Sequence, residues 1–190
     1  MRLWTVQPIE VYDNILKNGE YKCAPAKAEL LSYKEFKNAY KWLAKKMNEK
    51  SPAPTNVFYP VWAWHTRDWK HKKPDLRNIG LGTKGEKSVC LEIEIPDDEV
   101  FLTDFDAWHF ILNNTFIPRS DNETDWDIEW ALYNKMDSEE KEKYKLNSWN
   151  EVFNISPFEN DWMIRGKHIQ ATFWKLKKEN IVKVQFFTAR

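Results

Sequence analysis

The segment Tyr59–Trp69, YPVWAWHTRDW, gathers residue types that could bind a flat ligand. On a strand, Trp62 and Trp64 would share one face. Indole rings stack on nucleobases, and guanidinium groups pair with phosphates. The segment is therefore consistent with the wall of a nucleotide-binding cleft and equally with a strand that is buried on both faces. The side chains that could take part are Tyr59, Trp62, Trp64, His65, Arg67 and Arg77.

A second candidate group lies in DFDAWH, where Asp106 and His109 are three residues apart. Residues at this spacing lie on one face of a helix, so the carboxylate could orient the imidazole. A histidine held in this way can act as a general base or contact a ligand. The alternative is a half-buried histidine with a local hydrogen bond.

Polar residues also recur at alternate positions on two other predicted strands. HIQATFW, near the carboxyl end, places Gln170 and Thr172 on one face, and LWTVQ offers Thr5 and Gln7 near the amino end. A polar strip beside an aromatic strip is typical of a ligand cleft. We therefore expect Thr5, Gln7, Gln170 and the aromatic segment to converge.

Several other kinds of site are disfavoured. The glycine-rich stretch NIGLGTKGEK lacks the Gly-Lys-Ser/Thr ending of a phosphate-binding loop, so a flexible loop is the better interpretation. The histidines and cysteines do not occur at zinc-site spacing, and we expect no metal. The two cysteines, Cys23 and Cys90, are too far apart in sequence to suggest a disulfide framework, which favours a reducing, cytoplasmic location.

Composition limits the class of protein. A chain of 190 residues fits one domain, residues 1–190, and 42% hydrophobic with 31% charged residues is ordinary for a globular protein. Eleven tryptophans are unusual and must lie in the core or at a binding surface. The 29 basic and 29 acidic residues cancel, which argues against a surface that is basic throughout but leaves a local nucleic-acid-binding patch possible. The absence of any run of about 18 apolar residues predicts no membrane span.

The elements that must position these residues follow from local patterns. LWTVQ predicts a strand, and a helix is expected to begin at Pro8 and to end before Gly19. Ser32 and Glu35 form a capping box that predicts the start of a second helix. The aromatic segment is the next strand, with Pro60 favouring an edge or a bulge.

The remaining pattern completes a mixed fold. The segment 67–87 predicts a long mobile loop, Ser88–Pro96 alternates as a strand, and Asp104 can cap the helix FDAWHFILNN. Residues 115–160 predict a helical insertion over the core, followed by the strands HIQATFWKL and NIVKVQFFTA. Because helices are grouped between strands, the pattern predicts an α+β fold with small mixed or antiparallel sheets and helices packed around them.

Several long phrases together resemble a bacterial and phage family, the domain-of-unknown-function family 3841. They are LWTVQPIEVYDNILKNG, YPVWAWH, KPDLR, CLEIEIPDDEVFLTDFDAWHFILN and IQATFW. The order of elements also resembles the ADP-ribosyltransferase fold, which implies a split sheet that binds NAD in the cleft between its halves. In that fold a residue of the first strand holds the nicotinamide ribose, an aromatic residue packs on the nicotinamide, and a late strand offers a glutamate.

Carried over by position, the resemblance implies NAD as cofactor. Thr5 and Gln7 match the ribose site, and Gln170 matches the glutamate position. The aromatic residue would be Tyr59, Trp62 or Trp64.

The chain departs from that pattern because its first strand has neither arginine nor histidine and HIQATFW has no glutamate. Either His65, Arg77 or His109 takes the place of these missing residues, or the protein transfers no ADP-ribose. The resemblance thus implies an ADP-ribosyltransferase-like toxin or phage-conflict enzyme that modifies nucleic acid or protein. The alternatives are a non-catalytic nucleotide- or RNA-binding module, and an antitoxin-like protein-interaction module that uses tryptophans as anchors.

Overall fold

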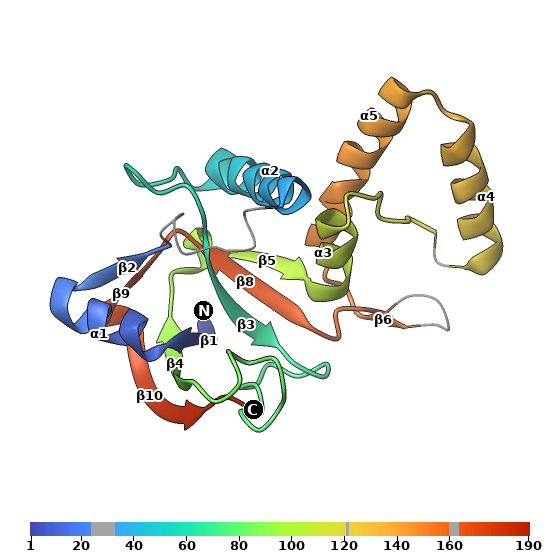
Figure 1. The fold of residues 1–190 in the computed structure, drawn as a ribbon. Coiled ribbons are helices and arrows are strands. Elements are labelled where there is room, and N and C mark those ends of the chain that lie inside the picture. Colours follow the sequence, from blue (N-terminus) through green and yellow to red (C-terminus); the bar gives the residue numbers. More distant parts are fainter. Residues whose placement is uncertain (24–32, 121, 160–163) are drawn as a thin grey trace.

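The structure is a computed structural model that describes residues 1–23, 33–120, 122–159 and 164–190. Its centre is a six-stranded antiparallel sheet in the order β10-β4-β1-β3-β8-β5 (Figure 1). The predicted α+β class, with an antiparallel sheet and helices around it, is confirmed. The strands are β1 (Arg2–Pro8), β3 (Val61–Thr66), β4 (Lys87–Glu94), β5 (Phe101–Asp104), β8 (Ile169–Phe173) and β10 (Ile181–Thr188).

The sheet consists of two halves that meet at a narrow junction. In one half β1 pairs with β4 along its whole length, and in the other half β3 pairs with β8 from Val61 to Thr66. Between the halves, the pairing of β1 with β3 in the described part of the chain is confined to Trp4 opposite Trp64. Beyond this pair the two strands diverge, which leaves room for side chains between them.

One face of the sheet carries a core of aliphatic residues. Leu3, Leu91 and Ala171 come from strands of both halves and are fully buried. Helix α1 (Ile9–Asn18) adds Ile15, and the small sheet of β2 (Glu20–Lys22) and β9 (Lys175–Lys177) adds Leu176. Gly19 ends α1 as predicted, in the left-handed conformation that favours glycine.

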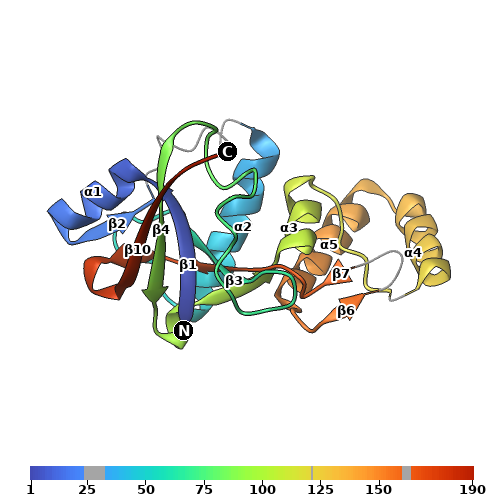
Figure 2. The same ribbon diagram turned by 90° about the horizontal axis from the view of Figure 1, so that it is seen from below.

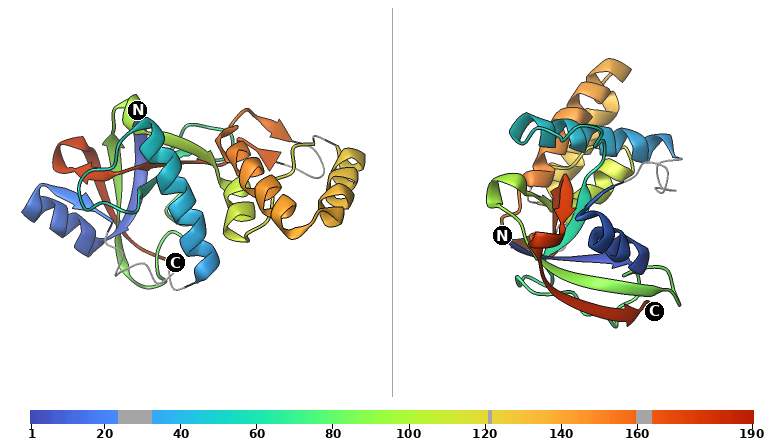
Figure 3. Two further views of the ribbon diagram at one scale, coloured as in Figure 1. Left: turned by 90° about the horizontal axis from the view of Figure 1, so that it is seen from above. Right: turned by 90° about the vertical axis from the view of Figure 1, so that its left-hand side faces the viewer.

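The other face is covered mainly by aromatic packing. Helices α2 (Lys34–Lys50) and α3 (Phe105–Leu112) and the 3-10 turn η4 (Trp149–Phe153) lie over it (Figure 3). Three of the eleven tryptophans, Trp108, Trp149 and Trp174, are buried in this cluster. Asp104 caps α3 as predicted, because its Oδ1 accepts a hydrogen bond of 2.8 Å from the Ala107 amide. The predicted cap of α2 at Ser32 lies outside the described residues.

Two further helices extend the molecule beyond α3. Helices α4 (Glu123–Lys135) and α5 (Ser138–Ser148) lie beside the sheet rather than over it, which corrects the predicted position (Figure 2). The short hairpin of β6 (Phe158–Glu159) and β7 (Ile164–Arg165) lies on the same side. The aromatic pattern explains the position, because Phe116 packs on rings of both helices, Trp130 of α4 and Tyr144 of α5.

No helix in the described ranges combines the length and the apolar character needed to cross a membrane.

Candidate functional site

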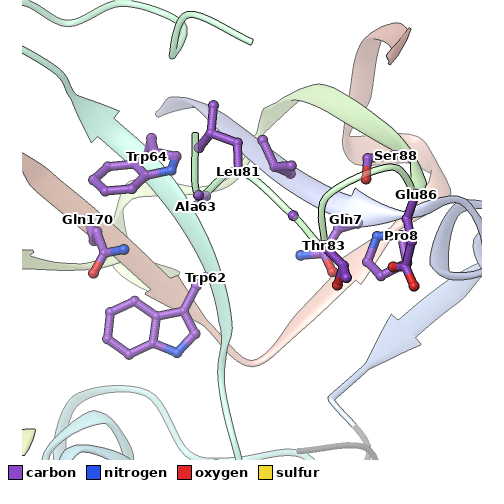
Figure 4. Close-up of a pocket in the computed structure, with 13 residues that line it drawn as sticks. Gln7, Pro8, Trp62, Ala63, Trp64, Leu81, Thr83, Glu86, Ser88 and Gln170 are labelled. Carbon is purple, nitrogen blue, oxygen red and sulfur yellow. The ribbon is translucent and has the colours of Figure 1, made fainter. Parts of the chain in front are cut away.

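A cavity of about 300 Å³ lies where β1 and β3 diverge (Figure 4). Strands β1, β3 and β8 contribute to it, and so does the loop between β3 and β4. The predicted residues Gln7, Trp62, Trp64 and Gln170 line this one cavity. The convergence follows from strand pairing, since Gln170 lies opposite Trp64 in the register of β8 and β3.

The two indoles of the cavity wall are held by their neighbours. The Arg67 guanidinium lies 4.2 Å from the centroid of Trp64, and Phe105 packs at a tilt 5.2 Å away. Trp62 packs edge-on against Tyr40 and at a tilt against Trp108. Its Nε1 is buried and has no hydrogen-bond partner among the described residues. Both rings are therefore fixed in place and only partly exposed.

Thr5 supports the cavity and does not line it. Thr5 is fully buried, and its hydroxyl donates a hydrogen bond of 2.7 Å to the Trp62 carbonyl. The same oxygen accepts a hydrogen bond of 2.7 Å from Gln7 Nε2. Thr5 thus bridges β1 and β3 after their backbone pairing has ended, and it fixes the amide of Gln7 at the edge of the cavity.

Replacing Thr5 by valine is expected to lower the free energy of unfolding by about 1–3 kcal/mol, because the buried Trp62 carbonyl loses its donor. Thr172→Val is the matched control, since Thr172 is equally buried but its hydroxyl lies 3.5 Å from the Phe101 carbonyl, at the limit of a hydrogen bond. Urea unfolding of both variants measures the difference. Equal losses would show that the bridge contributes nothing specific.

The loop between β3 and β4 covers the cavity and is anchored at several points. Gly80 and Gly82 line the cavity with φ of 88° and 125°, and a Cβ at Gly82 would lie 3.0 Å from Ser88 Oγ. At its end the Gly85 amide donates to the Ala189 carbonyl at 2.9 Å, and the Ala189 amide donates to the Glu86 carbonyl at 3.0 Å. The loop predicted to be mobile is thus tied to Ala189, the residue that follows β10.

Glu86 is the functional candidate that the sequence analysis missed. Its side chain lines the cavity near Gln7 and Thr83 (Figure 4). The resemblance implied a glutamate on the late strand, whereas the structure brings a carboxylate to the cavity from the loop just before β4. The signal available in the sequence was the glutamate in TKGEK, directly before a confident strand.

His65 stacks on another histidine and does not line the cavity. Its ring lies 4.3 Å from that of His71 with an angle of 14° between the planes. His71 Nε2 lies 2.8 Å from the Arg2 carbonyl, so this nitrogen carries a proton and donates. Burial lowers the pKa of His65, and the nearby His71 lowers it further.

Acidification from pH 7.5 to 5.5 is expected to destabilise the fold. The unfolded chain takes up a proton at His65 near the ordinary pKa of 6.5, whereas the folded chain does so only at lower pH. Stability contributed by the neutral ring is therefore lost as the pH falls. Melting temperatures across this range measure the effect, and His65→Asn should flatten the slope. A slope that is unchanged in this variant would contradict the role assigned to His65.

The other predicted side chains lie outside the cavity. Arg77 is exposed and makes a bidentate ion pair with Asp75. Tyr59 packs edge-on against Tyr40, with 6.3 Å between ring centroids. Arg67 reaches the site only through its stack on Trp64.

The predicted pair of Asp106 and His109 does not form. His109 Nδ1 lies 2.8 Å from the Phe105 carbonyl, four residues earlier, and takes its local hydrogen bond there. The local hydrogen bond of the alternative is therefore present, but the imidazole is exposed and not half-buried. Asp106 instead lines a second cavity beside α3, so the three predicted catalytic residues, Gln170, Asp106 and His109, are not brought together.

Comparison with known families gives one match. The model of a family described as domain of unknown function (DUF3841) matches residues 2–182, nearly the whole chain. No curated protein and no solved structure matches the chain. The resemblance to ADP-ribosyltransferases therefore has no support from these comparisons.

Proposed function

We propose that this protein, which belongs to the DUF3841 family, binds the nicotinamide and ribose of NAD in the cavity between β1 and β3. One observation carries the proposal. Two indoles and two carboxamides, from three strands distant in sequence, line a single cavity: Trp62, Trp64, Gln7 and Gln170.

Nicotinamide has the chemistry that these side chains can recognise. It is a flat ring that can pack against indole, and its carboxamide carries both donors and acceptors. A glutamine side chain also offers an NH₂ group and a carbonyl, so Gln170 and Gln7 can each pair with such a group. Because both indoles are fixed by their neighbours, little side-chain entropy would be lost on binding.

The size of the cavity limits what it holds. A volume of about 300 Å³ is at the lower end of the range of roughly 300–1,000 Å³ for small-molecule sites. We therefore assign only the nicotinamide and its ribose to the cavity, and the remaining nucleotide would lie outside. The Arg67 guanidinium, stacked on Trp64, supports this assignment because guanidinium N–H groups suit a pyrophosphate.

The proposed reaction is transfer of the ribosyl group. The bond between the ribose carbon and the nicotinamide nitrogen breaks, and nicotinamide leaves with the bonding electrons. A nucleophile, water or a group on an acceptor molecule, adds to the cationic ribosyl carbon and loses its proton. The Glu86 carboxylate would stabilise the positive charge that develops on the ribosyl group.

The test measures NAD binding by calorimetry and nicotinamide release by chromatography. We expect wild-type protein to bind NAD, and Trp64→Ala to weaken binding by about 10-fold or more, since stacking contributes roughly 1–3 kcal/mol per base. Trp69→Ala is the matched control, because Trp69 is a partly exposed indole of the same region that does not line the cavity. Neither binding nor release by wild-type protein would refute the proposal.

A second candidate is a nucleotide-binding module without catalysis. It is favoured by one observation, that the carboxylate lining the cavity is carried by a residue with an exposed side chain, Glu86. Exposure weakens the electrostatic stabilisation of a cationic intermediate. Binding of NAD with no release of nicotinamide over many hours would favour this function over transfer.

A further inference from the structure

A second cavity, of about 270 Å³, lies beside α3 and shares no lining residue with the first. Parts of the chain that are distant in sequence meet there: the end of β5, helix α3, the segment 117–118, helix α4, the turn η4 and the strand β7. Because so many elements contribute, the cavity is part of the fold and not a gap between two surface side chains. Its polar and aromatic lining includes Asp104, Asp106, Phe110, Trp126, Glu151 and Arg165.

The charge of this lining is negative. Asp104, Asp106 and Glu151 contribute three carboxylates, against one lining cation, Arg165. Glu151 is also paired with Arg119, whose Nε lies 3.5 Å from its Oε1. The side chain of Arg165 is already engaged, since its Nε donates to the Ser156 carbonyl at 3.1 Å and its guanidinium lies over the ring of a phenylalanine.

Asp104 is the deepest of the three carboxylates, with only 1% of its surface exposed. It accepts hydrogen bonds from the amides of Ala107 at 2.8 Å and Gly166 at 2.7 Å. Burial raises the pKa of Asp104, and the nearby Asp106 raises it further. A positive charge in the cavity would stabilise the ionised form of Asp104 and so oppose both causes of the raised pKa.

The rest of the lining is apolar or aromatic. Ile117 and Ile164 add aliphatic surface, and Phe110 and Trp126 add rings. Trp126 Nε1 is buried and has no hydrogen-bond partner among the described residues. Buried N–H groups in folded proteins are nearly always paired, so this donor is available to an acceptor of a bound molecule.

We propose that this cavity binds an organic cation, a guanidinium or alkylammonium group on an apolar stem with a carbonyl nearby. The carboxylates pair with the cation and the apolar surface covers the stem. Trp126 attracts the charge through its ring and donates its N–H to the carbonyl. A lysine or arginine side chain of a polypeptide has this chemistry, and so does a free amine that carries an acceptor.

The test uses N-acetyl-arginine amide as the probe and the ¹⁵N–¹H signal of the Trp126 indole as the readout. Trp126→Phe identifies the signal by deleting it. We expect the probe to shift this signal saturably, and the neutral citrulline analogue to bind at least about 10-fold more weakly. Butylguanidinium, which lacks the carbonyl, tests the contribution of the acceptor. It is expected to bind more weakly than the probe, and equal binding would contradict the pairing of a carbonyl with the Trp126 N–H.

Two substitutions, each of which removes one negative charge, test whether the probe binds in this cavity. Asp106→Asn removes a carboxylate of the cavity and is expected to weaken binding of the probe by about 10-fold, as loss of a charged hydrogen bond implies. Asp127→Asn changes an exposed carboxylate of α4, next to Trp126 in sequence, and should leave binding unchanged. Equal binding of the arginine and citrulline probes by wild-type protein, or no shift of the Trp126 signal, would overturn the proposal.

Discussion

Replacing Glu86 by glutamine is expected to lower the rate of nicotinamide release from NAD by about 100-fold or more. Removal of one group that stabilises developing charge typically costs roughly 10²–10³ in kcat. Glutamine keeps the shape and polarity of Glu86 at the cavity, so NAD binding should change much less than turnover. Initial rates at saturating NAD, together with calorimetric binding of NAD, measure the two effects separately.

Glu179→Gln serves as the control for this substitution. Glu179 is an exposed carboxylate between β9 and β10, paired with Lys177, and it does not line the cavity. Its variant should release nicotinamide at the wild-type rate. If the Glu86 variant does so as well, the role assigned to Glu86 is wrong, whereas loss of NAD binding would instead point to a structural effect.

The second large effect concerns stability and is expected at Gly166. Its φ is 81°, and a Cβ there would lie 2.8 Å from the Ile155 carbonyl oxygen and 3.1 Å from Pro157 Cα. Both neighbours are backbone atoms, which cannot move aside as a flexible side chain could. Gly166→Ala is therefore expected to lower the free energy of unfolding by roughly 2–5 kcal/mol, from left-handed strain and overpacking together. Denaturant unfolding measures it.

Gly19→Ala separates these two contributions. Gly19 has almost the same φ, 80°, but a Cβ there would meet nothing within 4 Å. The loss at Gly19 should be about 1–2 kcal/mol, because only the left-handed strain remains. If both alanine variants are equally stable, the close approach of the 155–157 backbone is not a constraint.

Much of the fold could be predicted because its signals are local. The helix between Pro8 and Gly19 and the cap at Asp104 depend on a few neighbouring residues. The position of α4 and α5 could not be predicted in this way. It depends on contacts such as those of Phe116 with Trp130 and Tyr144, which join segments far apart in sequence.

The candidate site could also be predicted in part from local patterns. Strand alternation brings Trp62, Trp64 and Gln170 to one face, and the pairing of β3 with β8 completes the wall. His65 is absent from this wall because alternation places it on the face opposite Trp64, and the register of β3 also shifts between Trp64 and Thr66. Such a bulge changes the direction of a side chain, and it cannot be located from residue types alone.

The positions of side chains in the loop between β3 and β4 were harder to predict from the sequence. Arg77 is bound by Asp75, two residues away, and this local ion pair competes with any role in ligand binding. Glu86 reaches the cavity only because of the path of the loop, which is determined by hydrogen bonds to Ala189, about a hundred residues later in the chain.

The attachment of this loop to Ala189, the residue after β10, would couple access to the cavity to an edge strand of the sheet. Strand β10 pairs with β4 on one side and has no strand on its other side in the described sheet. Edge strands fray more readily than central ones because half of their backbone groups lack a partner strand. When the end of β10 frays, the hydrogen bonds of Gly85 and Glu86 with Ala189 break as well. The loop that covers the cavity beside Trp62 and Trp64 can then move away from it. Local unfolding at the end of the strand would thus control the opening of the cavity to solvent.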